Sequence, residues 1–335
     1  MAVSPDGRAT AVRRNVYWAA RGAQVKVILH IGAHRTGTTS FQAYLRRHAD
    51  ELRASGIGFW GPRRTRTGLF SGIQPKPGRS FAAAKRARGR IMLQMDRAAR
   101  DGVKTLLISD ENLMGSVRLN LRTGRLYPDV GERLSRYFYG FNGAVDKVVM
   151  SVRGLDQYWS SAAAYGVGRG HTKLSPACCS AIAEETRSWR DVIEDVACAA
   201  PKTKIEVVPF ETISGRCDHL FTACTEQGAP RAHNAEWLNR APTAAQLRSI
   251  LTERGEDSSS LPDTCERWNP FDAAARAALR ETYADDMHWL VAGANGLAKL
   301  TEEFGPARAR NTLPHGPQNR GQGHDKQEGR VAHPR

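Results

Sequence analysis

The stretch VKVILHIGAHRTGTTSFQAYLRRH, residues 25–48, decides the fold class. It begins with a short apolar run, passes through a loop that contains Gly32 and Gly37, and then places apolar residues at helical spacing. The residues with that spacing are Phe41, Leu45, His48 and Leu52. A strand, a glycine-containing loop and a helix in this order expose unpaired backbone N–H groups and the positive end of the helix dipole, which together form an anion site.

The two glycines have the separation found in the phosphate-binding motif G-x-x-x-x-G-K-[ST], but the lysine of that motif is missing. Thr38 stands in its place, and the cation of the loop, Arg35, comes before the second glycine. We therefore expect a phosphate-like ligand at this loop, held differently from the nucleotide of a P-loop enzyme. A plain tight turn is the alternative interpretation.

Three further apolar runs predict strands: VKTLLISDEN from Val103, VDKVVMSVRG from Val145 and KIEVVPFE from Lys204. Short β-branched runs that alternate with helices are typical of a parallel sheet covered on both faces, in which ligands bind at the carboxyl ends of the strands. The sequence thus predicts a P-loop-like three-layer α/β fold with a central parallel sheet flanked by helices.

The chain of 335 residues carries 49 Lys and Arg against 34 Asp and Glu, a formal net charge of +15 that favours anionic partners. We expect a flexible leader at residues 1–24, one α/β domain at 25–304 and a disordered basic tail at 305–335, where large apolar residues are nearly absent. Residues 61–90 contain many cations and no acid. This segment is predicted to be a mobile basic insertion on the surface.

The cysteines and the hydropathy pattern predict a cytoplasmic protein. The 6 cysteines form no C-x-x-C pair and have no histidines near them at zinc-finger spacing, so we expect reduced thiols. No segment approaches the roughly 18 apolar residues of a membrane span, and the first residues lack a secretory apolar core. We therefore predict no transmembrane segment.

The sequence HRTGTT resembles the 5′-phosphosulfate loop of the PAPS-dependent sulfotransferases, in which a Lys and then a Ser or Thr precede G-T-T. The corresponding residues here are Arg35, Thr36, Gly37, Thr38 and Thr39. The stretch ILHIGAHRTGTTSFQAYL is similar to the bacterial branch of that family, and the resemblance extends from about Val25 to Leu300. Arg35 departs from the usual Lys, but a leaving phosphate needs charge stabilisation and not a proton.

A second motif points to the same family, which grips the 3′-phosphate of its donor with an Arg at a strand end and a Ser eight residues later. The stretch VVMSVRGLDQYWSSAAAY supplies Arg153 and Ser161 at that spacing. An arginine fork and a hydroxyl in the next helix can bracket one phosphate. The alternative is a surface Arg and a helix Ser that meet this spacing by chance.

The resemblance implies in-line transfer of a sulfuryl group from PAPS to an acceptor hydroxyl or amine, with PAP as product and no metal. Arg35 and the loop amides would stabilise the departing charge, and Thr38 and Thr39 would bind the 5′-phosphate. Thr36 would shape the loop. Arg153 and Ser161, from the second motif, would fix the 3′-phosphate.

An acceptor hydroxyl needs a general base, and the strand KTLLISDEN delivers Asp110 and Glu111 to the same edge of the sheet. Successive strand residues point apart, and we favour Glu111. The alternative is that these acids cap the next helix or pair with arginines. His34 and His171 are weaker candidates, and His30 in the first strand is expected to be a core residue.

Two other function classes stay open. A divergent P-loop ATPase or kinase would use LLISDE as its Mg²⁺-binding strand, and a non-catalytic nucleotide-binding protein would need neither acid. The basic residues 61–90 could hold an anionic acceptor such as an acidic glycan or a phospholipid-linked sugar. Nucleic acid is disfavoured because no nucleic-acid module or aromatic-interleaved basic stretch is present.

Overall fold

A computed structural model describes residues 25–74 and 81–301 of the chain. The predicted leader at 1–24 and tail at 305–335 lie outside the described residues. All the described residues fall within a single compact unit.

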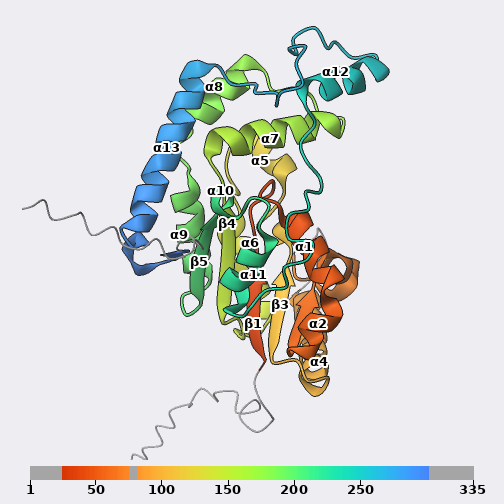
Figure 1. Cartoon of the computed structure of the whole chain (residues 1–335). Helices are drawn as coiled ribbons and strands as arrows, with labels where there is room; N and C mark the ends of the chain where they lie inside the picture. Colours follow the sequence, from red (N-terminus) through yellow and green to blue (C-terminus); the bar gives the residue numbers. More distant parts are fainter. Residues whose placement is uncertain (1–24, 75–80, 302–335) are drawn as a thin grey trace, which may run out of the picture. The chain divides into compact units, whose positions relative to one another are not determined.

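The centre of this unit is a six-stranded, all-parallel sheet in the order β2-β3-β1-β4-β5-β6 (Figure 1). The strands are β1 Lys26–His30, β2 Ile57–Trp60, β3 Thr105–Ser109, β4 Lys147–Val152, β5 Lys204–Pro209 and β6 Lys299–Leu300. The predicted α/β class with a parallel sheet is confirmed, and the four predicted strands are β1, β3, β4 and β5. The sequence analysis missed β2 and β6.

Helices connect the strands and cover the sheet. They are α1 Thr38–Arg47, α2 Ala49–Ala54, α3 Pro62–Arg64, the π-helical turn η2 Thr65–Leu69, α4 Phe81–Arg100, η3 Glu111–Leu113, α5 Val117–Thr123, α6 Val130–Gly140, α7 Leu155–Gly168, α8 Pro176–Glu184, α9 Trp189–Ala199, α10 Phe210–Ile213, α11 Cys217–Thr225, α12 Ala244–Glu253, α13 Ala273–Val291 and η4 Ala294–Gly296. Among these helices none is long and apolar enough to cross a membrane.

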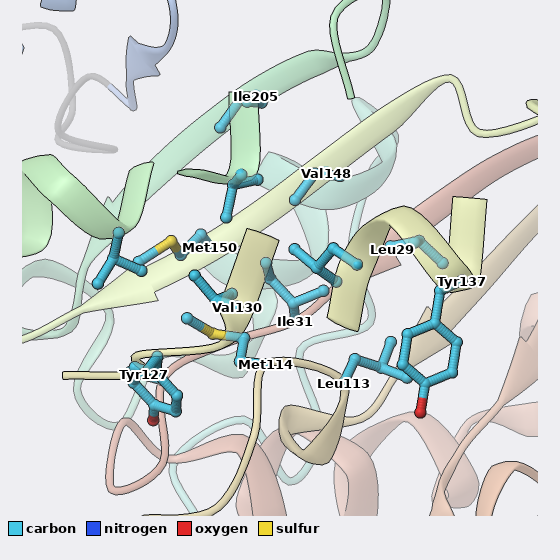
Figure 2. Packing of buried hydrophobic residues seen from close by; sticks show 14 of the residues in the cluster. Leu29, Ile31, Leu113, Met114, Tyr127, Val130, Tyr137, Val148, Met150 and Ile205 are labelled. Atoms are coloured by element: carbon cyan, nitrogen blue, oxygen red, sulfur yellow. The ribbon is translucent and has the colours of Figure 1, made fainter. Parts of the chain in front are cut away.

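The strands are apolar on both faces, as a sheet covered on both sides requires. Alternate residues, such as Leu29 in β1 and Val148 and Met150 in β4, pack with α6 into the main apolar core (Figure 2). Val130 is one of the α6 residues in this core. The residues between them point to the opposite face, where Phe41 of α1 contacts His30.

His30 is fully buried on that opposite face and is a core residue. Its Nδ1 lies 2.8 Å from Oγ of Ser109, and its Nε2 lies 3.5 Å from Oγ of Ser151. Burial lowers the pKa of His30 to about 3. The three side chains therefore form a small neutral polar cluster that links β1 to both of its neighbours in the sheet.

The basic segment 61–90 differs from the predicted mobile insertion over its described residues. Leu69, Phe70 and Ile73 are buried and belong to the main core, and Ala87 anchors α4 there too. Cations of the segment such as Arg63 and Arg86 are exposed, whereas Arg66 pairs with the buried Asp110. Residues 75–80, between the two parts, lie outside the described residues.

Candidate functional site

The loop between β1 and α1 contains three residues with positive φ, a backbone conformation that glycine adopts easily and other residues do not. Gly32, Arg35 and Gly37 have φ values of 29°, 68° and 78°. A Cβ on Gly32 would lie 2.8 Å from Oγ1 of Thr38, so no larger residue fits there. Thr36 stabilises the turn, because its hydroxyl donates to the carbonyl O of Ala33 at 2.7 Å.

This loop leads into an open helix N-terminus. No side chain caps α1, and its first turn contains no acid, so its first N–H groups are available to a ligand. Oγ1 of Thr38 is buried and has no hydrogen-bond partner among the described residues. A buried hydroxyl without a partner is costly, and an anion at the helix N-terminus would satisfy it. Thr39 lines the same pocket.

The two predicted arginines and Ser161 come together beside this helix end. Nη1 of Arg153, just after β4, donates to the carbonyl O of Arg35 at 2.9 Å. Nε of Arg35 donates to Oγ of Ser161 in α7 at 3.0 Å. The guanidinium of Arg35 also lies over the ring of Tyr165, 4.8 Å from its centroid. Residues from the β1 loop, β4 and α7 thus converge on one point.

The site is strongly positive. Burial lowers the pKa of Arg153 to about 10, with further contributions from the neighbouring Arg267 and Arg35. Burial also lowers the pKa of Arg35, and Arg267 and Arg169 act in the same direction. Guanidinium groups that are partly buried and close to one another repel, so bringing an anion among them relieves their mutual repulsion.

A pocket of about 630 Å³ surrounds these groups. Its lining includes Arg35, Thr38, Arg153 and Ser161 on one side. The residues of its lining that the sequence analysis missed include Tyr165, Phe210, Trp237, Arg240 and Arg267. Tyr165 and Phe210 lie within stretches that the sequence analysis quotes, whereas no spacing motif marks Trp237, Arg240 and Arg267.

Aromatic side chains form part of the pocket wall. Phe210, directly after β5, lies under the guanidinium of Arg153 at 4.9 Å from the ring centroid. Trp237 meets Phe210 edge to face, with their centroids 6.1 Å apart. Rings of this kind beside cations offer stacking surfaces for a planar group.

Asp110 and Glu111 occupy different environments. Asp110 is buried and accepts hydrogen bonds from Oγ1 of Thr65 at 2.5 Å and from Nη2 of Arg66 at 2.6 Å. Glu111 lines the pocket, where its Oε2 accepts from Nε2 of Gln42 at 3.1 Å. Its Oε1 accepts from Arg66 at 3.0 Å. Arg66 therefore bridges a structural carboxylate and a pocket carboxylate.

His34 also lines the pocket, but both ring nitrogens have partners. Nε2 lies 3.1 Å from Oδ1 of Asn112, which can only accept, and Nδ1 accepts from the hydroxyl of Tyr127 at 2.9 Å. Burial lowers the pKa of His34 and keeps the ring neutral. His171 is not part of the pocket lining. Among the described residues, no three His, Cys, Asp or Glu side chains form a metal-ligand group.

Comparisons with known proteins add no relative. No family model, curated protein or solved structure matches the chain. The site geometry and the motif resemblance are therefore the basis for a functional proposal.

Proposed function

We propose that this protein is a PAPS-dependent sulfotransferase that transfers a sulfuryl group to a hydroxyl or amine of an acceptor. One observation carries the proposal. Arg153 and Ser161, which are more than 100 residues from Arg35 in the sequence, meet it beside the open N-terminus of α1 in one pocket. A donor with phosphates at both its 5′ and 3′ positions needs two anion sites close together, and this arrangement supplies both.

The residues present fit such a donor. The amides at the start of α1 and the unpartnered hydroxyl of Thr38 suit the 5′-phosphosulfate. Arg153 retains donors beyond the one bonded to Arg35, and these suit the 3′-phosphate with Ser161 and Arg267 nearby. Phe210 and Trp237 offer rings against which the purine base could stack.

The chemistry requires one bond to form and one to break. The acceptor oxygen attacks sulfur, the bond from sulfur to the 5′-phosphate oxygen breaks, and PAP leaves with the negative charge. Arg35 and the loop amides stabilise that charge, which is the main requirement of such an in-line transfer. Glu111, at the pocket surface, accepts the proton of the acceptor hydroxyl.

A divergent ATPase or kinase is the competing proposal, and the loop gives it less support. Thr38 replaces the lysine that would reach the β- and γ-phosphates. The loop cation, Arg35, instead turns toward Ser161 and Tyr165. A non-catalytic nucleotide-binding protein would share the pocket but would not depend on Glu111.

The acceptor class and location complete the proposal. We propose an acidic glycan or a lipid-linked sugar as acceptor, because Arg240 and Arg267 line the pocket in addition to Arg35 and Arg153. All six cysteines are free in the structure, which supports a reducing, cytoplasmic compartment.

The deciding experiment is calorimetric binding of PAP, ADP and AMP to the purified chain in moderate salt without magnesium. We expect PAP to bind at least tenfold more tightly than AMP, because the charge-assisted contact to its 3′-phosphate contributes about 1.5–3 kcal/mol, and more tightly than ADP, whose second phosphate is on the 5′ side. Equal affinities, or ATP binding only with magnesium, would contradict the proposal and favour the ATPase. With PAP binding established, release of PAP from PAPS in the presence of candidate acceptors separates an enzyme from a binding protein.

A further inference from the structure

Outside the pocket, the most unusual surface is the outward face of α4. The helix buries Ala87, Ile91 and Met95 against the core, and its opposite side faces water. The exposed cations on that side are Lys85, Arg86, Arg97 and Arg100. Figure 1 shows α4 at the outside of the α/β unit, at the lower right.

Arginines from neighbouring elements extend this positive surface. Arg64 in α3 lies over the ring of Trp60 at 4.4 Å and donates to Oε1 of Gln94 in α4 at 2.5 Å. Burial lowers the pKa of Arg64, and the nearby Arg97 lowers it further.

Burial lowers the pKa of Arg46, at the end of α1, and the nearby Arg63 lowers it further. Within the described part of the chain, Arg46, Arg63, Arg64 and Arg97 form no ion pair with an acid. The fold thus collects mutually repelling guanidinium groups on one surface, where Asp96 of α4 is an acid next to Arg97 in the sequence but forms no ion pair with them. Such a surface has a strong affinity for an anionic partner.

Two large apolar side chains of α4 are exposed, Leu93 among the cations and Phe81 at the start of the helix, where its ring lies beside that of Tyr139. Phe81 is 73% and Leu93 is 65% exposed. Leu93 lies one helical turn from Arg97, since residues four apart are neighbours on a helix surface. Apolar side chains among cations contribute nothing to binding a polyanion, whereas both groups interact favourably with the headgroup region of an anionic bilayer.

We propose that this surface, which we call the α4 basic face and define by Phe81, Lys85, Arg86, Leu93, Arg97 and Arg100 with Arg63 and Arg64 beside them, docks onto an anionic lipid bilayer. The cations bind the negative headgroups, and Phe81 and Leu93 enter the boundary between headgroups and acyl chains. Docking is peripheral, and it does not depend on the function of the pocket.

The test is co-sedimentation of the full chain with vesicles of phosphatidylcholine alone or with one third phosphatidylglycerol. We expect binding to the anionic vesicles only, and weaker binding as salt is raised. The double variant Arg86→Gln, Arg97→Gln should bind about thirtyfold more weakly, since each cation contributes roughly 1 kcal/mol near an anionic surface. Leu93→Gln should weaken binding by about tenfold through loss of apolar burial.

Matched controls lie on distant parts of the surface. Val291→Gln removes an apolar residue that is also 73% exposed, and Lys202→Gln removes an exposed cation. Both should bind like the unchanged chain. Every variant has the same cations at residues 1–24, 75–80 and 302–335, so a difference between variants reports on the substituted positions. Equal binding to both vesicle types, or unchanged binding of the arginine variant, would overturn the proposal. A loss in the arginine variant with normal binding by Leu93→Gln would also overturn it, because that surface would be a polyanion site, which heparin binding would then demonstrate.

Discussion

Arg153 and Arg35 are joined by a hydrogen bond from Nη1 of Arg153 to the carbonyl oxygen of Arg35, at 2.9 Å. Arg35 has a φ of 68°, a conformation that is costly for a residue with a side chain. The bond therefore holds the β1 loop in a strained shape from the end of β4. Arg153 has two tasks in the proposed function, to shape the 5′ site and to bind at the 3′ site.

Replacing Arg153 should affect nucleotides unequally. In Arg153→Ala, we expect PAP affinity to fall about 100-fold through loss of a charge-assisted phosphate contact, and ADP affinity to fall only about fivefold through the relaxed loop. Calorimetry with both ligands measures the two losses. Arg248→Ala, which alters an arginine outside the pocket, should change neither, and equal losses for both nucleotides would remove the proposed 3′ role.

The two neighbouring acids should respond in opposite ways. Glu111→Gln should reduce turnover by about 10²- to 10⁴-fold while PAP affinity stays nearly unchanged, because it removes the general base. Asp110→Asn should instead lower the free energy of unfolding by about 1–2 kcal/mol, because the buried carboxylate loses its charge-assisted bond to the half-exposed Arg66, which keeps Glu111. Steady-state kinetics and denaturant unfolding measure these effects on the same two proteins.

Each of these two variants serves as the control for the other. A Glu111→Gln protein with full turnover would place the base elsewhere, and unchanged stability in Asp110→Asn would show that the contacts to Thr65 and Arg66 contribute little. In that case the difference in burial between the two carboxylates would not reflect a difference in role.

The sequence predicted the sheet wherever a strand was long and apolar on both faces, as in β1 and β4. It missed β2, which has four residues including Gly58, and β6, which has two, because neither provides a period to detect. It also did not identify the buried residues within 61–90. The prediction for this segment was based on its charge and did not consider the few apolar residues, such as Phe70, that lie in the core.

The sequence predicted those residues of the candidate site that belong to short motifs directly after a strand. The loop after β1 and the Arg153–Ser161 spacing are local in sequence, and the structure places them in one pocket. Trp237 and Arg267 reach the pocket from the second half of the chain through tertiary packing alone. No local pattern marks such residues, so only the folded chain reveals them.

Tyr165 should act as a positioning residue for Arg35. The guanidinium of Arg35 lies 4.8 Å from the ring centroid, and a cation–π contact of this kind contributes about 0.5–2 kcal/mol. We expect Tyr165→Leu to lower kcat about fivefold with little change in KM, and Tyr165→Phe to restore it. Arg35→Lys should retain much of the activity, because an ammonium supplies the same charge.

Tyr139→Leu is the matched control for Tyr165, because Tyr139 carries the guanidinium of Arg88 at 5.2 Å, away from the pocket. Its kinetics should match those of the unchanged chain. A kcat for Tyr165→Leu that equals that of the control would show that Ser161 alone orients Arg35.

His30 should make the stability of the protein fall in mild acid. Burial lowers its pKa in the folded protein from 6.5 to about 3, so below pH 6.5 the unfolded chain takes up a proton that the folded chain does not. The contribution is complete above pH 6.5 and is lost as pH falls toward 3. Between pH 7.5 and 5 it should lower the free energy of unfolding by about 2 kcal/mol. Denaturant unfolding of the unchanged chain and of His30→Asn at pH 7.5 and 5 measures this loss. The variant should lack the contribution of His30 to the fall in stability, and the control His288→Asn, which changes an exposed histidine, should retain it. A slope equal in all three proteins would mean that other groups cause the acid sensitivity.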